Sequence, residues 1–152
     1  MIIKVYADES GTHAGSNYLM LSGYIGTLGK WITFDRAWRR RLAREGLEYF
    51  HAVEHNRRRA NEDLRYDLLK LCGKHLKCGF TIRLKKKSYD DFYIAGQRPK
   101  GVQLDTMYGA CYRYLLSFLL TEIPQLLNRI DLQIDIMLEA GAEIIVLTNP
   151  TL

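Results

Sequence analysis

Residues 2–11 read IIKVYADESG, and this stretch decides the fold because an apolar run ends abruptly in two acids and a turn. Residues 2–7 are mostly β-branched or aromatic, which is typical of a strand, and the Ser-Gly that follows favours a tight turn. Residues 18–25 read as a second strand, joined to the first by a hairpin loop. The chain is therefore predicted to open with a β-hairpin, with Asp8 and Glu9 at the end of the first strand.

The middle of the chain carries helical periodicity. Apolar residues recur every three to four positions in two stretches, which indicates two amphipathic helices inserted after the second strand. The first stretch carries Trp31, Phe34, Trp38 and Leu42, and the second, from about Asn61, carries Leu64, Leu68, Leu71, Cys72 and Leu76. Residues 46–61 break the pattern between them. A third strand is predicted over residues 80–84.

The last part of the chain pairs a long helix with an alternating strand. Residues 104–127 carry an apolar stripe at helical spacing. In residues 131–139, one face carries Leu132, Ile134, Ile136 and Leu138, and the other carries Asp131, Gln133, Asp135, Met137 and Glu139. A strand, a long crossover helix and a further strand favour a mixed sheet in which the last strand lies parallel to a neighbour. The predicted class is α/β, with a helical segment inserted between strands two and three.

The composition points to one compact domain inside the cell. The chain has 152 residues, of which 47% are hydrophobic and 26% charged, as expected for residues 1–152 forming a single soluble domain. It carries no apolar run of membrane-spanning length and no signal peptide, so we expect a cytoplasmic protein with no membrane partner. Three cysteines without C-x-x-C spacing are expected to be reduced thiols.

The basic residues are clumped. The net charge is +5, and much of the positive charge lies in three separate runs of three consecutive basic residues. They are Arg39-Arg40-Arg41, Arg57-Arg58-Arg59 and Lys85-Lys86-Lys87. Such runs suit nucleic acid as a partner, and the alternative is a solvated face plus a basic turn. We expect the 57–59 and 85–87 triplets to make any nucleic-acid contact.

Asp8, Glu9 and Glu139 are the candidate metal ligands. Asp8 and Glu9 end the first strand, and Glu139 ends the last one; if the two strands are parallel neighbours, these acids lie at one edge of the sheet. Carboxylates at such a point can hold a divalent cation, although Asp, Ser and Gly are also ordinary turn residues. Because consecutive side chains of a strand face opposite ways, Glu9 reaches the site of Asp8 only if the chain already turns there.

His51-Ala-Val-Glu54-His55 spells H-x-x-E-H, the zinc motif of inverted zincin peptidases. On a helix, the two histidines would share a face and could bind zinc with Glu54 as the base. The segment leads into an arginine triplet, offers no third ligand and belongs to a short chain. Chance occurrence therefore explains the motif better than a peptidase, and His51 is kept as a polar neighbour of the acidic site.

Four segments together resemble the bacterial domain-of-unknown-function family 3800. They are residues 5–11 (VYADESG), 18–25 (YLMLSGYI), 50–52 (FHA) and 136–141 (IMLEAG). The family looks like a ribonuclease-H-like fold, so the resemblance implies a metal-dependent, nuclease-like site with Asp8, Glu9 and Glu139 as its acids. It implies Mg²⁺ or Mn²⁺ as the cofactor and phosphodiester bonds as the target. Ser10, His51 and Asp105 are accessory candidates.

The chain departs from the family after residue 141. Family members continue with a helix, a strand and a further acid, so the resemblance implies a domain that lacks its last strand and helix. Two readings stay open: a metal-dependent nuclease-like protein, or a catalytically inactive copy that binds nucleic acid or a protein partner. In either case the exposed sheet edge predicts self-association, and the β-prone residues 144–147 can supply a substitute edge strand or pair between subunits.

Overall fold

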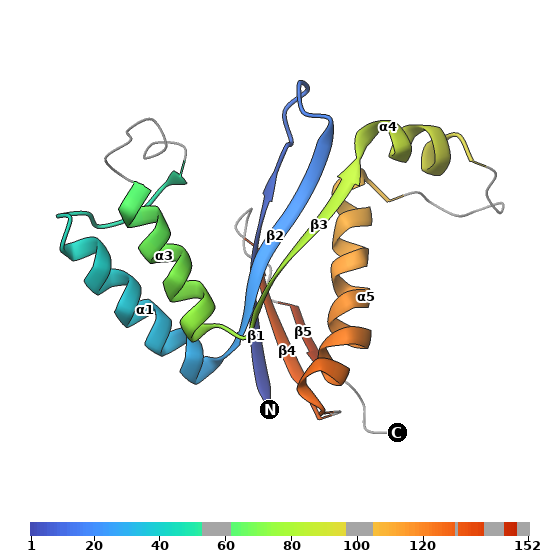
Figure 1. The fold of residues 1–152 in the computed structure, drawn as a ribbon. Helices are drawn as coiled ribbons and strands as arrows, with labels where there is room; N and C mark the ends of the chain where they lie inside the picture. The colour runs from blue at the N-terminus through green and yellow to red at the C-terminus, as the bar shows by residue number, and fades with distance from the viewer. Residues whose placement is uncertain (53–61, 97–104, 130, 139–144, 149–152) are drawn as a thin grey trace.

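The computed structural model describes residues 1–52, 62–96, 105–129, 131–138 and 145–148. Its centre is a mixed sheet in the order β3-β2-β1-β4-β5 (Figure 1). The strands are β1 (Ile2–Ser10), β2 (Tyr18–Thr27), β3 (Cys78–Lys85), β4 (Gln133–Leu138) and β5 (Ile145–Thr148). The α/β class and the mixed sheet are confirmed.

Helices lie where the periodicity places them. Between β2 and β3 come α1 (Leu28–Ala43) and α3 (Glu62–His75), which form the inserted helical segment. After β3 come the short α4 (Lys86–Ser88) and η2 (Tyr89–Ile94), followed by the long α5 (Met107–Leu127). Within the described residues, no helix is long and apolar enough to cross a membrane.

The pairing of β1 decides the topology. It is antiparallel to β2 and parallel to β4, and Val5 aligns with Ile25 on one side and Ile136 on the other. The parallel neighbour was predicted from the long crossover helix, which is now α5. Residues 145–148 fold back as β5, antiparallel to β4, as one of the two predicted alternatives requires.

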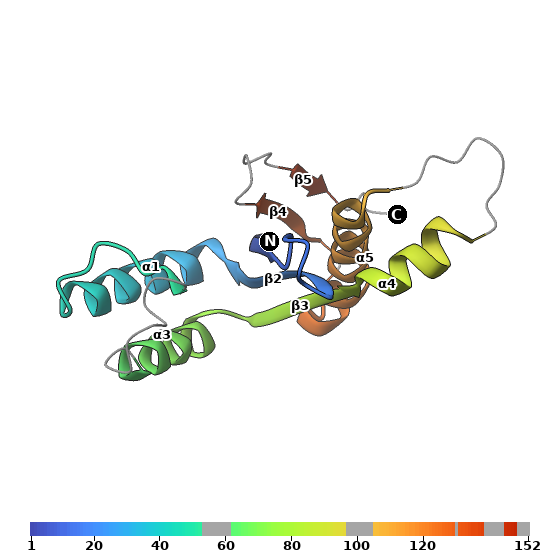
Figure 2. The same cartoon turned by 90° about the horizontal axis from the view of Figure 1, so that it is seen from above.

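The two faces of the sheet are covered differently. On one face α5 packs against β2 and β3, and its fully buried Cys111, Leu115 and Leu119 share a core with Ile3, Val5 and the apolar residues of β4. Apolar alternation drives this packing, because odd positions of β1 and even positions of β4 share that face. Figure 2 shows α5 on one side of the sheet and the α1–α3 pair on the other.

The α1–α3 pair is attached to the second face through Trp31. Its indole Nε1 donates a hydrogen bond to the carbonyl oxygen of Lys4 at 3.0 Å, and its ring lies 4.5 Å from the ring of Tyr6. Behind this contact, Leu42, Leu64 and Leu68 form a second, smaller apolar cluster. Among the described residues, no helix packs on this face toward the carboxyl end of β1.

Candidate functional site

The carboxyl ends of β1, β3 and β4 lie at one edge of the sheet. β3 is antiparallel to β2, which is antiparallel to β1, and β4 is parallel to β1. The three strands therefore run in the same direction, and α5 begins beside their ends (Figure 1). Edges of this kind collect ligands in open α/β sheets. Asp8, Glu9 and the 85–87 triplet all lie near this edge.

Asp8 opens onto a cavity of about 590 Å³ on the face opposite α5. Its side chain is exposed, and its cross-strand partner on β2 is Ser22. The Ser22 hydroxyl is 3.1 Å from the Thr81 hydroxyl on β3, so a row of short polar groups runs beside the carboxylate. The cavity is lined by Tyr6, Ala7, Asp8, Ser22, Gly23, Tyr24, Met137 and Leu138.

The lower end of this cavity is aromatic and apolar. Tyr24 lies across Gly79 on β3, where a β-carbon would come within 2.9 Å of its ring. Burial, followed by the charge of the nearby Cys72 thiol and a hydrogen bond to it, raises the pKa of the Tyr24 phenol. The neutral phenol is therefore the form held against α3. The cavity thus combines one carboxylate with hydroxyls and ring faces.

Glu9 lies on the opposite face from Asp8. β1 continues to Ser10, with Glu9 aligned with Leu21, so the strand does not turn at the acidic pair. The Glu9 side chain is half-buried, and its Oε2 is buried without a hydrogen-bond partner among the described residues. Burial of the phenol, then the negative charges of Glu9 and Asp8, raises the pKa of Tyr108 on α5. Glu9 is therefore near the start of α5, apart from the cavity.

Two of the three predicted metal ligands, Asp8 and Glu9, lie among the described residues. A buried carboxylate oxygen without a partner is a feature that a cation or a donor can satisfy. However, the described part of the chain contains no group of three or more His, Cys, Asp or Glu residues that could hold a metal ion. Glu139 lies outside the described residues; the residue before it in sequence, Leu138, is aligned with Ala7. Asp8 is thus the candidate ligand that faces the cavity.

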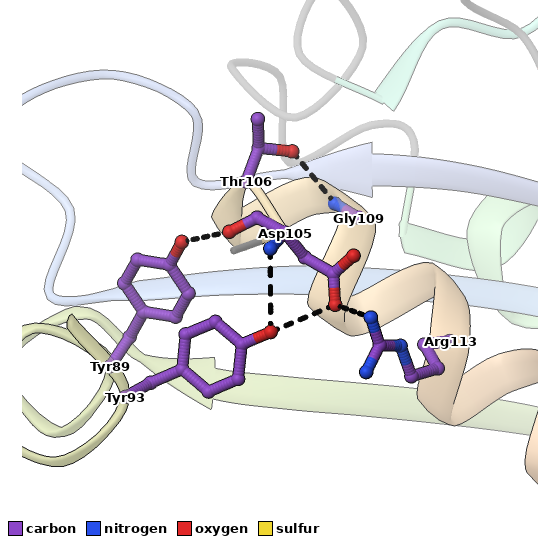
Figure 3. Close-up of polar contacts among 6 residues, drawn as sticks. All are labelled: Tyr89, Tyr93, Asp105, Thr106, Gly109 and Arg113. Atoms are coloured by element: carbon purple, nitrogen blue, oxygen red, sulfur yellow. Dashed lines mark hydrogen bonds and ion pairs between the residues drawn. The ribbon is translucent and has the colours of Figure 1, made fainter. Parts of the chain in front are cut away.

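Asp105 is held in a separate polar cluster at the start of α5 (Figure 3). The Tyr93 hydroxyl donates to its Oδ2 at 2.9 Å, and the Arg113 guanidinium forms an ion pair with the same oxygen. The Tyr89 hydroxyl donates to its carbonyl oxygen. These contacts tie η2 to α5 and engage Oδ2 of the carboxylate twice. Asp105 is better explained as a structural residue than as an accessory ligand of the site of Asp8.

The remaining sequence candidates are dispersed. Ser10 is exposed at the end of β1. His51 follows Phe50, whose ring packs 6.4 Å from Trp38 in the smaller apolar cluster, so the histidine belongs to the helical segment. The 57–59 triplet and residues Glu54 and His55 of the zinc motif lie outside the described residues.

The 85–87 triplet is partly engaged in local contacts. Lys86 donates to the carbonyl oxygen of His13 at 2.7 Å, which fastens the hairpin loop to the end of β3. Lys87 forms an ion pair with Asp91 at 3.0 Å. Lys85 is exposed at the last position of β3. Only part of this triplet is therefore available to a phosphate backbone.

Sequence reasoning missed the neighbours of Asp8 on the cavity face. Ser22 and Tyr24 alternate along β2, and Met137 precedes the last residue of β4. Once the strand register is known, the alternation of side chains along each strand places these residues on the same face as Asp8. The register itself depends on where β1 ends. Comparison of the chain with protein families, curated proteins and solved structures finds no match, so the residues and their geometry carry the functional inference.

Proposed function

We propose that the chain is a metal-dependent, nuclease-like protein that acts on phosphodiester bonds of nucleic acid. The observation that carries the proposal is the position of Asp8, exposed on a cavity of about 590 Å³ at the carboxyl edge of the sheet. β4 reaches the same edge, with Leu138 aligned with Ala7, and Glu139 is the next residue in sequence. The cavity is large enough to admit part of a nucleotide.

Asp8 is proposed as the ligand on the cavity face, with Glu9 and Glu139 as the further acids. Glu9 Oε2 is buried without a hydrogen-bond partner among the described residues, which supports the binding of a cation or a hydrogen-bond donor at the start of α5. When bound, Mg²⁺ or Mn²⁺ supplies Lewis acidity for an attacking water and a leaving oxygen. The chain itself orients the substrate. The Ser22 and Thr81 hydroxyls lie beside Asp8, and the rings of Tyr6 and Tyr24 in the cavity lining offer a surface for a base or sugar.

The topology supports a ribonuclease-H-like fold as the finer description. A β-hairpin opens the chain, the crossover helix α5 leads to β4, and β4 is parallel to the central β1. The helical segment between β2 and β3 is an insertion into this topology. β5 takes the edge position beside β4 by folding back antiparallel, where family members continue with a helix and a strand.

A non-catalytic nucleic-acid-binding protein is the second candidate. One observation favours it: Asp8 and Glu9 lie on opposite faces of β1, so two consecutive carboxylates do not converge on one ion. The exposed basic side chains of the chain can contact nucleic acid whether or not the protein is catalytic. This candidate requires binding that persists when divalent metal is removed.

The proposed compartment is the reducing cytoplasm. All three cysteines, Cys72, Cys78 and Cys111, are free, and Cys72 and Cys111 are buried. Burial raises the pKa of the Cys78 and Cys111 thiols, which keeps them protonated and unreactive. Free, buried thiols of this kind are typical of proteins that fold in a reducing environment.

Cleavage assays with three variants distinguish the two candidates. Labelled single-stranded and double-stranded DNA and RNA are incubated with Mg²⁺, Mn²⁺ or EDTA, using the wild type, Asp8→Asn and Asp63→Asn. Asp63 is an exposed acid in the first turn of α3 and serves as the matched control. We expect metal-dependent cleavage that Asp8→Asn reduces at least 100-fold, about 3 kcal/mol of barrier, and that Asp63→Asn leaves intact.

Two results contradict the nuclease proposal. Cleavage that survives Asp8→Asn moves the reaction to another site. No cleavage by the wild type, combined with binding in EDTA, supports the non-catalytic candidate instead.

A further inference from the structure

The α1–α3 pair carries a basic groove that lies apart from the cavity of Asp8. The groove has a volume of about 620 Å³ and is walled by both helices. Six basic side chains line it: Arg36, Arg40, Arg41 and Arg44 from the α1 side, and Lys70 and Lys74 from α3. Among the described residues, Asp67 is its only acidic lining residue. The lining is thus far more basic than the chain as a whole.

One of these cations is neutralised by carboxylates, and the other five have no such partner among the described residues. Arg41 is paired with Asp67 at 2.9 Å and with Glu45 at 2.7 Å, which fastens α1 to α3. Within the described part of the chain, none of Arg36, Arg40, Arg44, Lys70 and Lys74 has a carboxylate within ion-pair distance, and all five are exposed. Like charges held this close repel one another, so an anion in the groove would relieve the repulsion.

The spacing of the arginines fits a chain of phosphates. Arg36, Arg40 and Arg44 are four residues apart on one side of α1. A rise of 1.5 Å per residue puts successive guanidinium stems about 6 Å apart, so the row covers about 12 Å. A single small anion would engage one or two of these groups and leave the rest unpaired. A nucleic-acid strand, with a phosphate roughly every 3.4 Å along a helical axis, engages all three.

The shape of the groove favours a single strand. The cations lie on two walls, with Lys70 and Lys74 on the helix facing the arginine row. A single strand lying between the helices can contact both walls, as in the positively charged grooves that track single-stranded backbones. Next to the groove, Tyr66 is 61% exposed, and Lys70 Nζ lies 4.1 Å from the centre of its ring. An exposed ring beside a basic track is a stacking platform for bases.

We propose that the groove between α1 and α3 binds the phosphate backbone of single-stranded nucleic acid. The choice of nucleic acid among polyanions rests on the proposed function. The site itself uses neither Asp8 nor a metal ion. None of Lys85, Lys86 and Lys87 is in its lining, and it would hold a strand on the same face of the sheet to which the α1–α3 pair is attached.

Fluorescence anisotropy in EDTA tests the groove separately from catalysis. The probe is a labelled 20-nucleotide single strand of mixed sequence, titrated at several salt concentrations. The groove variant is Arg36→Gln, Arg40→Gln and Arg44→Gln combined. The matched control is Lys30→Gln, Arg65→Gln and Lys77→Gln combined, which removes the same charge from exposed positions outside the lining. Circular dichroism checks that both variants fold.

The salt dependence of binding sets the expected changes in slope and in affinity. Each phosphate neutralised on a single strand contributes about −0.7 to the slope of log K against log salt, so losing three arginines should flatten the slope by about 2. At 0.1 M salt this corresponds to roughly 100-fold weaker binding. The control variant should bind within about threefold of the wild type. Lys70→Gln with Lys74→Gln, on the other wall, should weaken binding and flatten the slope by about 1.4.

Three outcomes would overturn the inference: no binding by the wild type, equal losses in the groove and control variants, or displacement of the probe by polyglutamate as effectively as by unlabelled strand. The last result would make the groove a site for acidic protein. An inactive Asp8→Asn that still binds through the groove leaves the inference standing. Failure of the proposed nuclease and failure of the groove are therefore separate results.

Discussion

Lys4 Nζ lies 2.9 Å from Asp135 Oδ2, and the two residues are direct register partners across the parallel strands β1 and β4. The side chains are 23% and 12% exposed, so the ion pair is largely removed from water. The hydrogen bond from Lys4, helped by one from Gln133, lowers the pKa of Asp135 against the opposing effect of burial. This pair is a polar link in the strand pairing that decides the topology.

Acid should therefore weaken the sheet through Asp135. Its folded pKa is depressed below the ordinary value of 3.8, so its stabilisation is fully present above that value and is lost as the pH falls through the folded pKa. Asp135→Asn should cost about 2 kcal/mol at pH 7, with a smaller cost below pH 3. Urea unfolding of both proteins between pH 2.5 and pH 7 measures the difference. A cost that does not vary with pH would falsify the assignment.

Glu9→Gln should stabilise the metal-free protein by about 1 kcal/mol. The change removes a charge whose Oε2 is buried without a partner among the described residues, and a neutral amide costs less to bury. Thermal unfolding in EDTA measures it, with Glu48→Gln as an exposed control. If Glu9 binds a divalent ion, adding Mn²⁺ should raise the melting temperature of the wild type more than that of Glu9→Gln. Destabilisation in EDTA would show that Glu9 already has a partner.

Gly23→Ala should destabilise the sheet by about 2–3 kcal/mol, as expected for overpacking. A β-carbon at this position would lie 2.1 Å from the Tyr6 carbonyl oxygen and 2.9 Å from the Ala7 Cα, and backbone cannot move aside cheaply. Gly73→Ala is the contrasting control, because that glycine is inside α3 with nothing within 4 Å of a β-carbon. It should stabilise the protein by roughly 0.5–1 kcal/mol. Similar values for the two variants in urea unfolding would contradict this account.

The outer edges of the sheet should promote self-association. β3 and β5 each pair with one neighbour only in the described sheet, which leaves unpaired backbone groups along two edges. Sedimentation velocity at low micromolar concentration should show dimers or larger species that increase with protein concentration. A monomer that is thermally stable over the whole concentration range would show that these edges are protected.

The sequence predicted the topology well where the pattern was strict. The alternation in residues 131–139 placed Ile134 and Ile136 on one face, and both are buried against α5. The long apolar stripe of α5 implied a crossover, and the crossover implied a parallel neighbour. The extent of β1 was misjudged because Asp-Glu-Ser-Gly has turn composition. Cross-strand pairing with Ser22, Leu21 and Met20 keeps residues 8–10 in the strand instead.

The candidate site was only partly accessible from sequence. Extending β1 by three residues puts Glu9 on the α5 face, which no local propensity reveals. The 85–87 triplet looked available, but two of its lysines are engaged by His13 and Asp91. The 39–41 triplet already contains Arg40 and Arg41 of the basic groove, but the four-residue spacing of Arg36, Arg40 and Arg44 does not by itself predict a groove. Only helix geometry, and the packing of α3 beside α1, turns that spacing into a surface.

The central position of β1 has a consequence for synthesis on the ribosome. One side of β1 pairs with the nearby β2, but its other side pairs with β4, and Lys4 and Asp135 are 131 residues apart in the chain. At a translation rate of about 5–20 residues per second, β4 follows β1 by roughly 7–26 seconds. Throughout that interval the nascent hairpin keeps one edge open to a chaperone or to a neighbouring nascent chain. The yield of correctly folded protein should therefore depend on how fast the segment between the two strands is translated.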